Sequence, residues 1–151
     1  MSQIRFFNAS TMAIDDNPAG RPAMQVILPR AIESRGDQTV VLWDDEPWRS
    51  VWALVDTGAD HNVIDKNLAQ RLGWVPHGQA SMTGFGHQEM VPVYDQKVFF
   101  PSCRNLCDAS FVGSSLTDIG NYMPLIIGMA VIRLGVLTMD FRAQKFELSF
   151  I

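Results

Sequence analysis

Hydrophobic and polar positions alternate along this chain in short runs that are typical of β-strands. Apolar segments cover residues 24–32, 39–43 and 48–55, and turn-forming residues separate them. Two longer segments, 80–100 and 135–150, each contain a turn and are predicted to be hairpins. We also expect the segments 39–43 and 48–55 to form a hairpin around the turn Asp-Asp-Glu-Pro.

Two short segments have the end signals of helices instead. Residues 65–73 begin with Asp65, a suitable N-cap, and end at Gly73, which suits a helix C-terminus. Residues 129–135 follow Gly128 and also end on a glycine. Many short strands with two short helices predict a compact, mostly β, barrel-like fold.

Length and composition indicate one globular domain. The chain has 151 residues, of which 47% are hydrophobic and 19% charged. No apolar run approaches the roughly eighteen residues of a membrane span, so we expect no membrane association. Asp15 and Asp16 interrupt the N-terminal segment before any signal-peptide core builds up, which favours a cytoplasmic protein. The net charge of -4 argues against nucleic acid as a partner.

The two cysteines, Cys103 and Cys107, do not predict a metal site. A zinc site needs more ligands, and the histidines at positions 61, 77 and 87 are scattered along the chain. We expect two reduced cysteines in a loop, with a local disulfide as the main alternative. No metal and no cofactor is predicted.

Asp56 is the residue that most needs an explanation. It follows the apolar stretch 52–55, and burying an unpaired charge is expensive, so it serves either hydrogen-bonded structure or chemistry. Gly58 permits a sharp turn, the hydroxyl of Thr57 can clamp a neighbouring loop, and the small Ala59 leaves room beside the carboxylate. If Asp56 serves to hydrolyse an amide with an unassisted water, one carboxylate must take a proton from the water and a second, protonated carboxyl group must polarise the carbonyl.

The segment LVDTGADHNVI, residues 54–64, resembles the active-site signature of the retropepsin-like aspartic proteases, the retroviral-protease family. The family's second element, two apolar residues and a glycine that open a short helix, is matched by residues 126–128. A glycine-tipped hairpin at 82–90 lies between them, where the family has its flap. The helix after the signature and the final hairpin favour a cellular, bacterial member.

The resemblance covers roughly residues 24–150 and implies a protease domain at 24–151, a closed, retropepsin-like β-barrel with one or two short helices and a β-hairpin flap. Residues 1–23 are left as an N-terminal arm of unknown role. Only one Asp-Thr-Gly occurs, so the resemblance implies a homodimeric aspartic endopeptidase that cleaves polypeptides with one Asp56 from each subunit. Its implied catalytic residues are Asp56, Thr57 and Gly58, and its implied substrate-binding residues are Ala59, Asp60, His61, Gly84, Phe85, Gly86 and Ile126.

The chain departs from the family after the second glycine. Retroviral members usually have Arg and then Asn or Asp there, whereas this chain has Met129 and Ala130. Asp60 therefore lacks its usual partner, for which Arg133, Arg142 or an arginine of the other copy could substitute. This departure leaves open a non-catalytic retropepsin-fold module that binds a peptide or forms an interface. An unrelated ligand-binding β-barrel is a third hypothesis.

Overall fold

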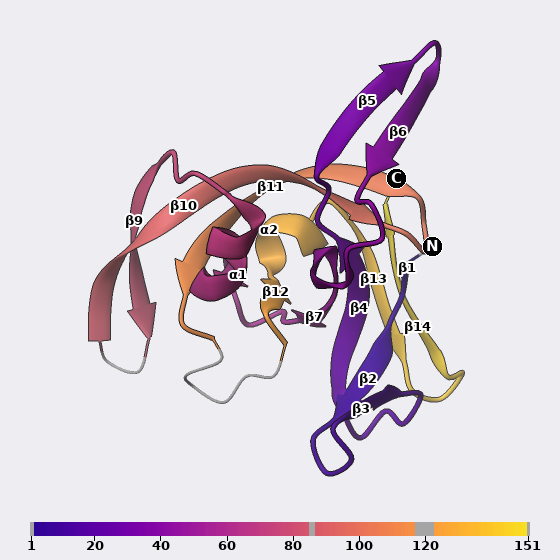
Figure 1. Cartoon of the computed structure of the whole chain (residues 1–151). Coiled ribbons are helices and arrows are strands. Elements are labelled where there is room, and N and C mark those ends of the chain that lie inside the picture. Colours follow the sequence, from indigo (N-terminus) through magenta and orange to yellow (C-terminus); the bar gives the residue numbers. More distant parts are fainter. Residues whose placement is uncertain (1, 85–86, 117–122, 151) are drawn as a thin grey trace.

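The computed structural model describes residues 2–84, 87–116 and 123–150, and its elements are mostly strands, as predicted (Figure 1). Fourteen strands and two short α-helices occur in this part of the chain. Their bounds are β1 Ser2–Gln3, β2 Arg5–Asn8, β3 Ala13–Asp15, β4 Arg21–Ile27, β5 Ala31–Arg35, β6 Gln38–Leu42, the 3-10 helix η1 Pro47–Arg49, β7 Ser50–Val55, β8 Asn62–Asp65, α1 Lys66–Leu72, β9 Gly78–Gly84, β10 His87–Phe100, β11 Asn105–Ser114, β12 Leu125–Ile127, α2 Met129–Ile132, β13 Gly135–Asp140 and β14 Lys145–Phe150.

The main sheet closes on itself and forms the predicted barrel. Its strands follow the order β3-β2-β4-β7-β12-β8-β11-β10-β9. Strand β4 also pairs with β10, through Ile27 and Phe99. The strands from β4 through β7, β12, β8 and β11 to β10 therefore form a ring, and closure leaves few free strand edges.

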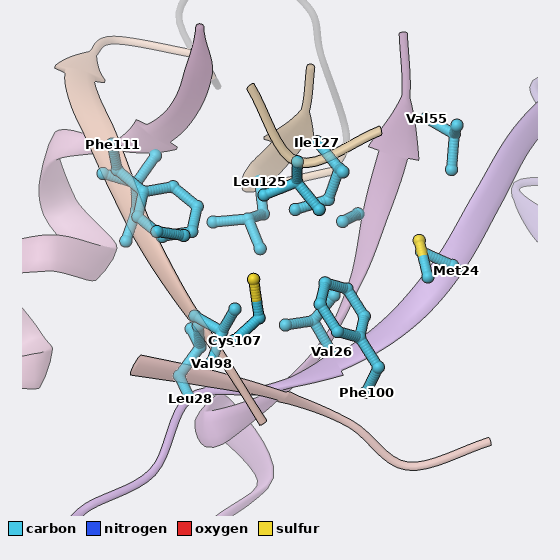
Figure 2. Packing of buried hydrophobic residues seen from close by; sticks show 14 of the residues in the cluster. Met24, Val26, Leu28, Val55, Val98, Phe100, Cys107, Phe111, Leu125 and Ile127 are labelled. Carbon is cyan, nitrogen blue, oxygen red and sulfur yellow. The ribbon is translucent and has the colours of Figure 1, made fainter. Parts of the chain in front are cut away.

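The barrel interior is filled by alternate residues of these strands (Figure 2). On β10, Val98 and Phe100 are fully buried, and on β4, Met24 and Val26 are fully buried as well. Such alternation follows from the two-residue period of a strand, which sends successive side chains to opposite faces. The main apolar cluster contains Met24, Val26, Leu28, Val55, Val98, Phe100, Cys107, Phe111, Leu125 and Ile127.

Strands β7 and β12 run parallel, and this pairing decides where the candidate site lies. Leu125 pairs with Ala53, and Ile127 pairs with Val55. On its other side, β12 pairs antiparallel with β8. The residue after β7, Asp56, therefore lies beside the residue at the end of β12.

Two of the predicted strands are arranged differently in the structure. The segment 24–32 is not continuous, because β4 ends before Pro29, which has no N–H to offer a sheet. The predicted hairpin between 39–43 and 48–55 is wrong, since β6 pairs with β5 and β7 pairs with β4. Asp44 and Asp45 have φ angles of 54° and 53°, and a 3-10 helix follows them, so the chain turns away from β6.

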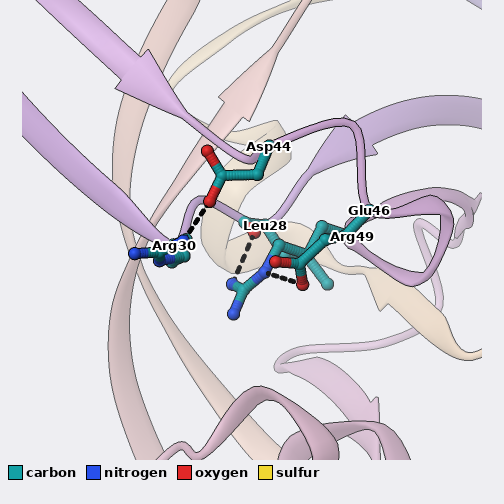
Figure 3. A network of polar contacts seen from close by, with 5 residues as sticks. All are labelled: Leu28, Arg30, Asp44, Glu46 and Arg49. Atoms are coloured by element: carbon teal, nitrogen blue, oxygen red, sulfur yellow. Dashed lines mark hydrogen bonds and ion pairs between the residues drawn. The ribbon is translucent and has the colours of Figure 1, made fainter.

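The β5–β6 hairpin projects from the barrel, and polar contacts hold its base (Figures 1 and 3). Arg30 forms an ion pair with Asp44 across this base. The buried Arg49 places Nε 3.1 Å from an oxygen of Glu46 and donates through Nη1 to the carbonyl of Leu28, at 3.2 Å. These contacts tie the segment between β6 and β7 to the end of β4.

The local predictions for helices and for the other hairpins are confirmed. Asp65 caps α1 by accepting the N–H of Asn67 at 3.2 Å, and Gly73 ends it with a left-handed φ of 72°. Strands β9 and β10 form one hairpin and β13 and β14 another. Helix α2 ends at Ile132, earlier than predicted, because β13 already begins at Gly135.

Strands from the N-terminal segment are packed onto the rest of the chain. Strand β1 pairs with β14, while β2 lies between β3 and β4. Ile4 and Phe6 are buried, and the ring of Phe6 meets that of Phe146 edge-on at 4.9 Å. A separate role for residues 1–23, and the domain boundary at residue 23, stay predictions.

Both cysteines are thiols, and they lie in different settings. Cys103 is half-buried in the turn between β10 and β11, whereas Cys107 is buried within β11. The prediction of a loop position is therefore wrong for Cys107. Within the described residues, no three His, Cys, Asp or Glu side chains are grouped so that they could hold a metal ion. The described helices are all too short or too polar to cross a membrane.

Candidate active site

Asp56 is fixed by the strand that precedes it and by the end of β12. In β7, Ala53 and Val55 face the core, and the strand ends directly before Asp56. The N–H of Asp56 donates a 2.9 Å hydrogen bond to the carbonyl of Ile127. The backbone of Asp56 is thereby held by the sheet, while its side chain is half-exposed.

The residues after Asp56 form a tight turn around its carboxylate. The N–H of Gly58 donates to Oδ1 of Asp56 at 2.8 Å, and the N–H of Ala59 donates to the Asp56 carbonyl at 3.3 Å. A Cβ on residue 58 would lie 3.2 Å from the same Oδ1, which is tighter than most such contacts. Glycine in the Asp-Thr-Gly signature therefore lets the backbone amide approach the carboxylate. Among the described residues, no hydrogen bond to the other oxygen, Oδ2, is found.

Gly128 brings the second sequence element against this turn. A Cβ at residue 128 would lie 2.4 Å from the carbonyl oxygen of His61 and 2.7 Å from that of Ala59. The next two amides then donate to the turn, Met129 N–H to Ala59 O at 2.7 Å and Ala130 N–H to Asp60 O at 3.1 Å. The structure therefore joins residues 56–61 and 126–130, which the sequence had placed far apart.

Asn62 completes this junction, and the sequence reasoning had missed it. It is fully buried in β8, where Oδ1 accepts the N–H of Gly128 at 2.9 Å. Its Nδ2 donates to the carbonyl of Ser110 on β11 at 3.0 Å. The available signal was a strongly polar residue directly before the apolar pair Val63 and Ile64.

The other predicted residues of the loop are directed to solvent in the single chain. Thr57, Asp60 and His61 are exposed, and Ala59 is half-exposed. Within the described residues, the Thr57 hydroxyl makes no hydrogen bond and the Asp60 carboxylate makes no ion pair. These groups are accessible to a substrate or to another chain.

In the described part of the chain, neither Arg133 nor Arg142, the two candidates within the chain to replace the usual partner of Asp60, forms an ion pair or a side-chain hydrogen bond with Asp60. Arg133 instead donates from Nε to the carbonyl of Met129, at 3.0 Å. Arg142 lies in the turn between β13 and β14, where its N–H donates to Asp140. The contacts that hold the loop to α2 come from backbone amides and from Asn62.

Ile126 connects the loop region with the predicted flap hairpin. It is half-buried and pairs with Leu54 on one side and Val63 on the other. It packs against a small apolar cluster that also contacts Met82 of β9. The buried members of that cluster are Val63, Val91, Val112 and Leu116.

The tip of the β9–β10 hairpin falls partly outside the described residues. Gly84 pairs with His87 at the last described position of each strand. Phe85, predicted to cover the substrate, and Gly86, predicted to let the tip open and close, lie outside the described residues. The hairpin itself is therefore shown, and its function as a flap stays a prediction.

Two hollows on the described surface are lined by other residues than the predicted catalytic ones. The larger one, about 720 Å³, lies between the start of β5 and the β10–β11 pair. The smaller one, about 230 Å³, is lined by apolar residues that include Phe7, Trp52 and Met123. Asp56 lines neither of these two hollows.

The closed barrel, the Asp-Thr-Gly turn and its junction with Gly128 define a retropepsin-like fold. Residues 41–103 match the family described as aspartyl protease. The fold is similar to that of a retropepsin-like aspartic protease from Rickettsia conorii, with 13% identity, a TM-score of 0.56, and coverage of 99% of this chain and 90% of that one.

A second solved structure is also similar, the retroviral protease-like domain of Ddi1 from Leishmania major. It has 13% identity and a TM-score of 0.50, and the match covers 100% of this chain and 91% of that one. No curated protein matches the sequence. The resemblance to the retropepsin-like aspartic proteases, which the sequence motifs suggested, is thus confirmed, and at these identities the similarity of structures establishes the fold.

Proposed function

We propose that this protein is an aspartic endopeptidase whose active site combines Asp56 from two copies of the chain. The observation that carries the proposal is the Asp56 turn. The carboxylate stands half-exposed at the end of β7, with Oδ1 held by the N–H of Gly58 and the backbone held by Ile127. Oδ2 has no hydrogen-bond partner among the described residues, so it is available to a water molecule or to a second carboxyl group. The match to the aspartyl protease family supports the same conclusion.

Pairing of two copies supplies the second carboxyl group that the chemistry requires. The exposed Thr57 and Asp60 stand next to Asp56 and are available to a partner. Strand β13 pairs only with β14 among the described residues, and it carries the exposed Val136, two residues after the exposed Leu134 that precedes the strand. A strand edge with exposed apolar residues readily pairs with another chain. This edge therefore fits a second copy.

In the proposed mechanism, the two Asp56 carboxyl groups share one proton. The ionised group takes a proton from a water molecule, while the protonated group donates a hydrogen bond to the carbonyl of the peptide. Water attacks the carbonyl carbon and forms a tetrahedral intermediate without a covalent bond to the enzyme. The C–N bond then breaks as the amine nitrogen receives a proton, and the pair returns to its single shared proton.

We assign substrate binding to the residues around this pair. Ala59, Asp60 and His61 continue from the turn, and Ile126 lies beside Leu54 in the neighbouring strand. The β9–β10 hairpin would act as a flap that excludes water, with Gly84, Phe85 and Gly86 at its tip. Met82 and Ile126 contact the same apolar cluster, which supports the placement of this hairpin near the substrate. The apolar lining favours apolar side chains around the cleaved bond.

The deciding experiment compares wild type, Asp56→Asn and Asp108→Asn against a broad peptide library. Asn keeps the size of Asp56 but cannot share a proton, so cleavage should be lost while the fold remains intact. Asp108 is an exposed carboxylate that pairs with Lys97 on the β10–β11 pair, and its replacement should leave cleavage unchanged. Cleavage by Asp56→Asn at a substantial fraction of the wild-type rate would disprove the proposal. Peptide binding without cleavage by wild type would instead support a non-catalytic binding module.

A further inference from the structure

Asn62 is a buried residue whose side-chain amide makes hydrogen bonds to Gly128, beside the candidate active site, and to Ser110 on the neighbouring strand β11. Its exposed fraction is 0%, and an unpaired amide in such a place is costly. Both polar atoms are hydrogen-bonded, Oδ1 to the N–H of Gly128 and Nδ2 to the carbonyl of Ser110. The side chain therefore links the end of β12 to β11. Ser110, its partner on β11, is 48 residues from Asn62 in sequence.

The position of Gly128 determines the position of the catalytic turn. The carbonyls of Ala59 and Asp60 accept the two amides that follow Gly128, at 2.7 and 3.1 Å. The residue before Gly128, Ile127, accepts the N–H of Asp56. A shift at Gly128 would thus be transmitted to the turn at three hydrogen bonds, including the one to Asp56 itself.

The side chains that begin α2 cannot replace this link. Met129 and Ala130 have no group that forms a strong hydrogen bond, so Asn62 is the side chain that braces the start of the helix. Without it, the Gly128 N–H would be left buried without an acceptor or would have to move. The side chain that holds the start of α2 therefore belongs to β8, the strand after the Asp56 turn, and not to α2 itself.

We propose that Asn62 is a positioning residue that holds Asp56 in the orientation needed for catalysis, an inference that rests on the proposed protease function. Two Asp56 side chains must meet across the dimer with little tolerance, and a misplacement of about 1 Å costs a rate factor of about 100. Loss of the brace should therefore lower kcat strongly and change KM little, since Asn62 is buried beneath the loop.

The test compares Asn62→Leu with Val98→Ala. Leucine is similar in size to asparagine but makes neither hydrogen bond. Val98 is fully buried on β10, and its side chain cannot form a hydrogen bond with the loop. Its truncation therefore measures the effect of a general loss of core stability. We expect Asn62→Leu to lower kcat by about 100-fold with KM changed less than about threefold. Val98→Ala should leave both close to wild type at temperatures where it is folded.

A second measurement does not depend on proteolysis. Hydrogen exchange of the Met129 and Ala130 amides reports opening of the bonds to Ala59 and Asp60. We expect exchange of both amides to be faster in Asn62→Leu than in Val98→Ala at matched stability. If Asn62→Leu does not fold, Asn62→Ala allows the same comparison, because a water can occupy the vacated space.

The outcomes separate the two proposals. Unchanged exchange at Met129 and Ala130 overturns the positioning role, and so does faster exchange with unchanged kcat. A fall in kcat that Val98→Ala reproduces at matched stability also overturns it. If wild type cleaves no peptide, the proposed function fails, and faster exchange in Asn62→Leu still supports Asn62 as the brace of this loop.

Discussion

The carbonyl oxygen of His61 lies so close to Gly128 that a Cβ on residue 128 would be 2.4 Å from it. This contact brings together two segments that are separated by more than sixty residues in the sequence. It places the amides at the start of α2 where they can bind the carbonyls of the Asp56 turn. The second glycine is thus required by close backbone approach, and the carboxylate depends on it for its position.

Replacement of Gly128 by alanine should therefore destabilise the protein and remove activity. Both atoms that the new Cβ would meet within 2.7 Å are backbone oxygens, which cannot rotate away. We expect a loss of about 1–3 kcal/mol in the free energy of unfolding, measured by urea denaturation. Gly78→Ala is the control, since a Cβ there meets nothing within 4 Å. Equal stability of the two variants would contradict the close contact.

Mixing of subunits should reveal a shared active site. If wild type and Asp56→Asn exchange freely in equal amounts, about a quarter of the dimers are fully wild type. Because the number of chains has doubled, total activity should fall to about half that of the original wild-type sample. Specific activity should also fall on dilution below the dimer dissociation constant. Undiminished activity, with sedimentation showing that mixed dimers form, would exclude one Asp56 per subunit as the catalytic pair.

Activity should have an optimum at acidic to neutral pH and fall on both sides. At low pH both carboxyl groups of the pair are protonated, and neither can accept the proton of water. At high pH both are ionised, and neither can donate to the peptide carbonyl. The profile of kcat/KM against pH measures this. A rate that still rises above about pH 9, beyond the range of ordinary carboxyl groups, would indicate a different base.

The two thiols should differ in reactivity. Burial raises the pKa of the Cys107 thiol above its ordinary value of 9.0, and Asp108 adds to the effect while Lys97 opposes it. Because the thiolate is the reactive form, iodoacetamide at about pH 8 should modify Cys103 before Cys107, as measured by mass spectrometry of the labelled peptides. Full labelling of Cys107 should require unfolding. Equal labelling rates in the folded chain would contradict its burial.

The same shift has a consequence for stability. The folded chain keeps the Cys107 proton at a pH where the unfolded chain loses it. The contribution to stability is therefore fully present below about pH 9 and is lost as pH rises through the raised pKa of the folded state. In Cys107→Ala this alkaline decline should be smaller, which urea denaturation between pH 8 and pH 10 can measure.

The sequence determined those features that depend on neighbouring residues. The cap at Asp65 and the left-handed Gly73 define α1, since both act within one turn of the helix. The hairpin of β13 and β14 was predictable because its strands are joined by a short turn. The Asp-Thr-Gly turn was also recognisable, because its hydrogen bond from Gly58 to Asp56 spans only two residues.

Only the tertiary structure decided the partners of β7 and the role of Asn62. A hairpin with the preceding strand was the simplest interpretation of the sequence, yet β7 pairs with β4 and with β12, which lies about seventy residues later. Closing such a long loop costs conformational entropy, and only the contacts of the whole barrel offset that cost. No local pattern in the sequence therefore encodes the pairing. In the sequence, Asn62 is simply a polar residue at the start of a strand. Its role is evident only in the fold, where the N–H of Gly128 donates to its amide oxygen. The sequence thus identified the carboxylate, and the fold supplied the contacts that hold it in place.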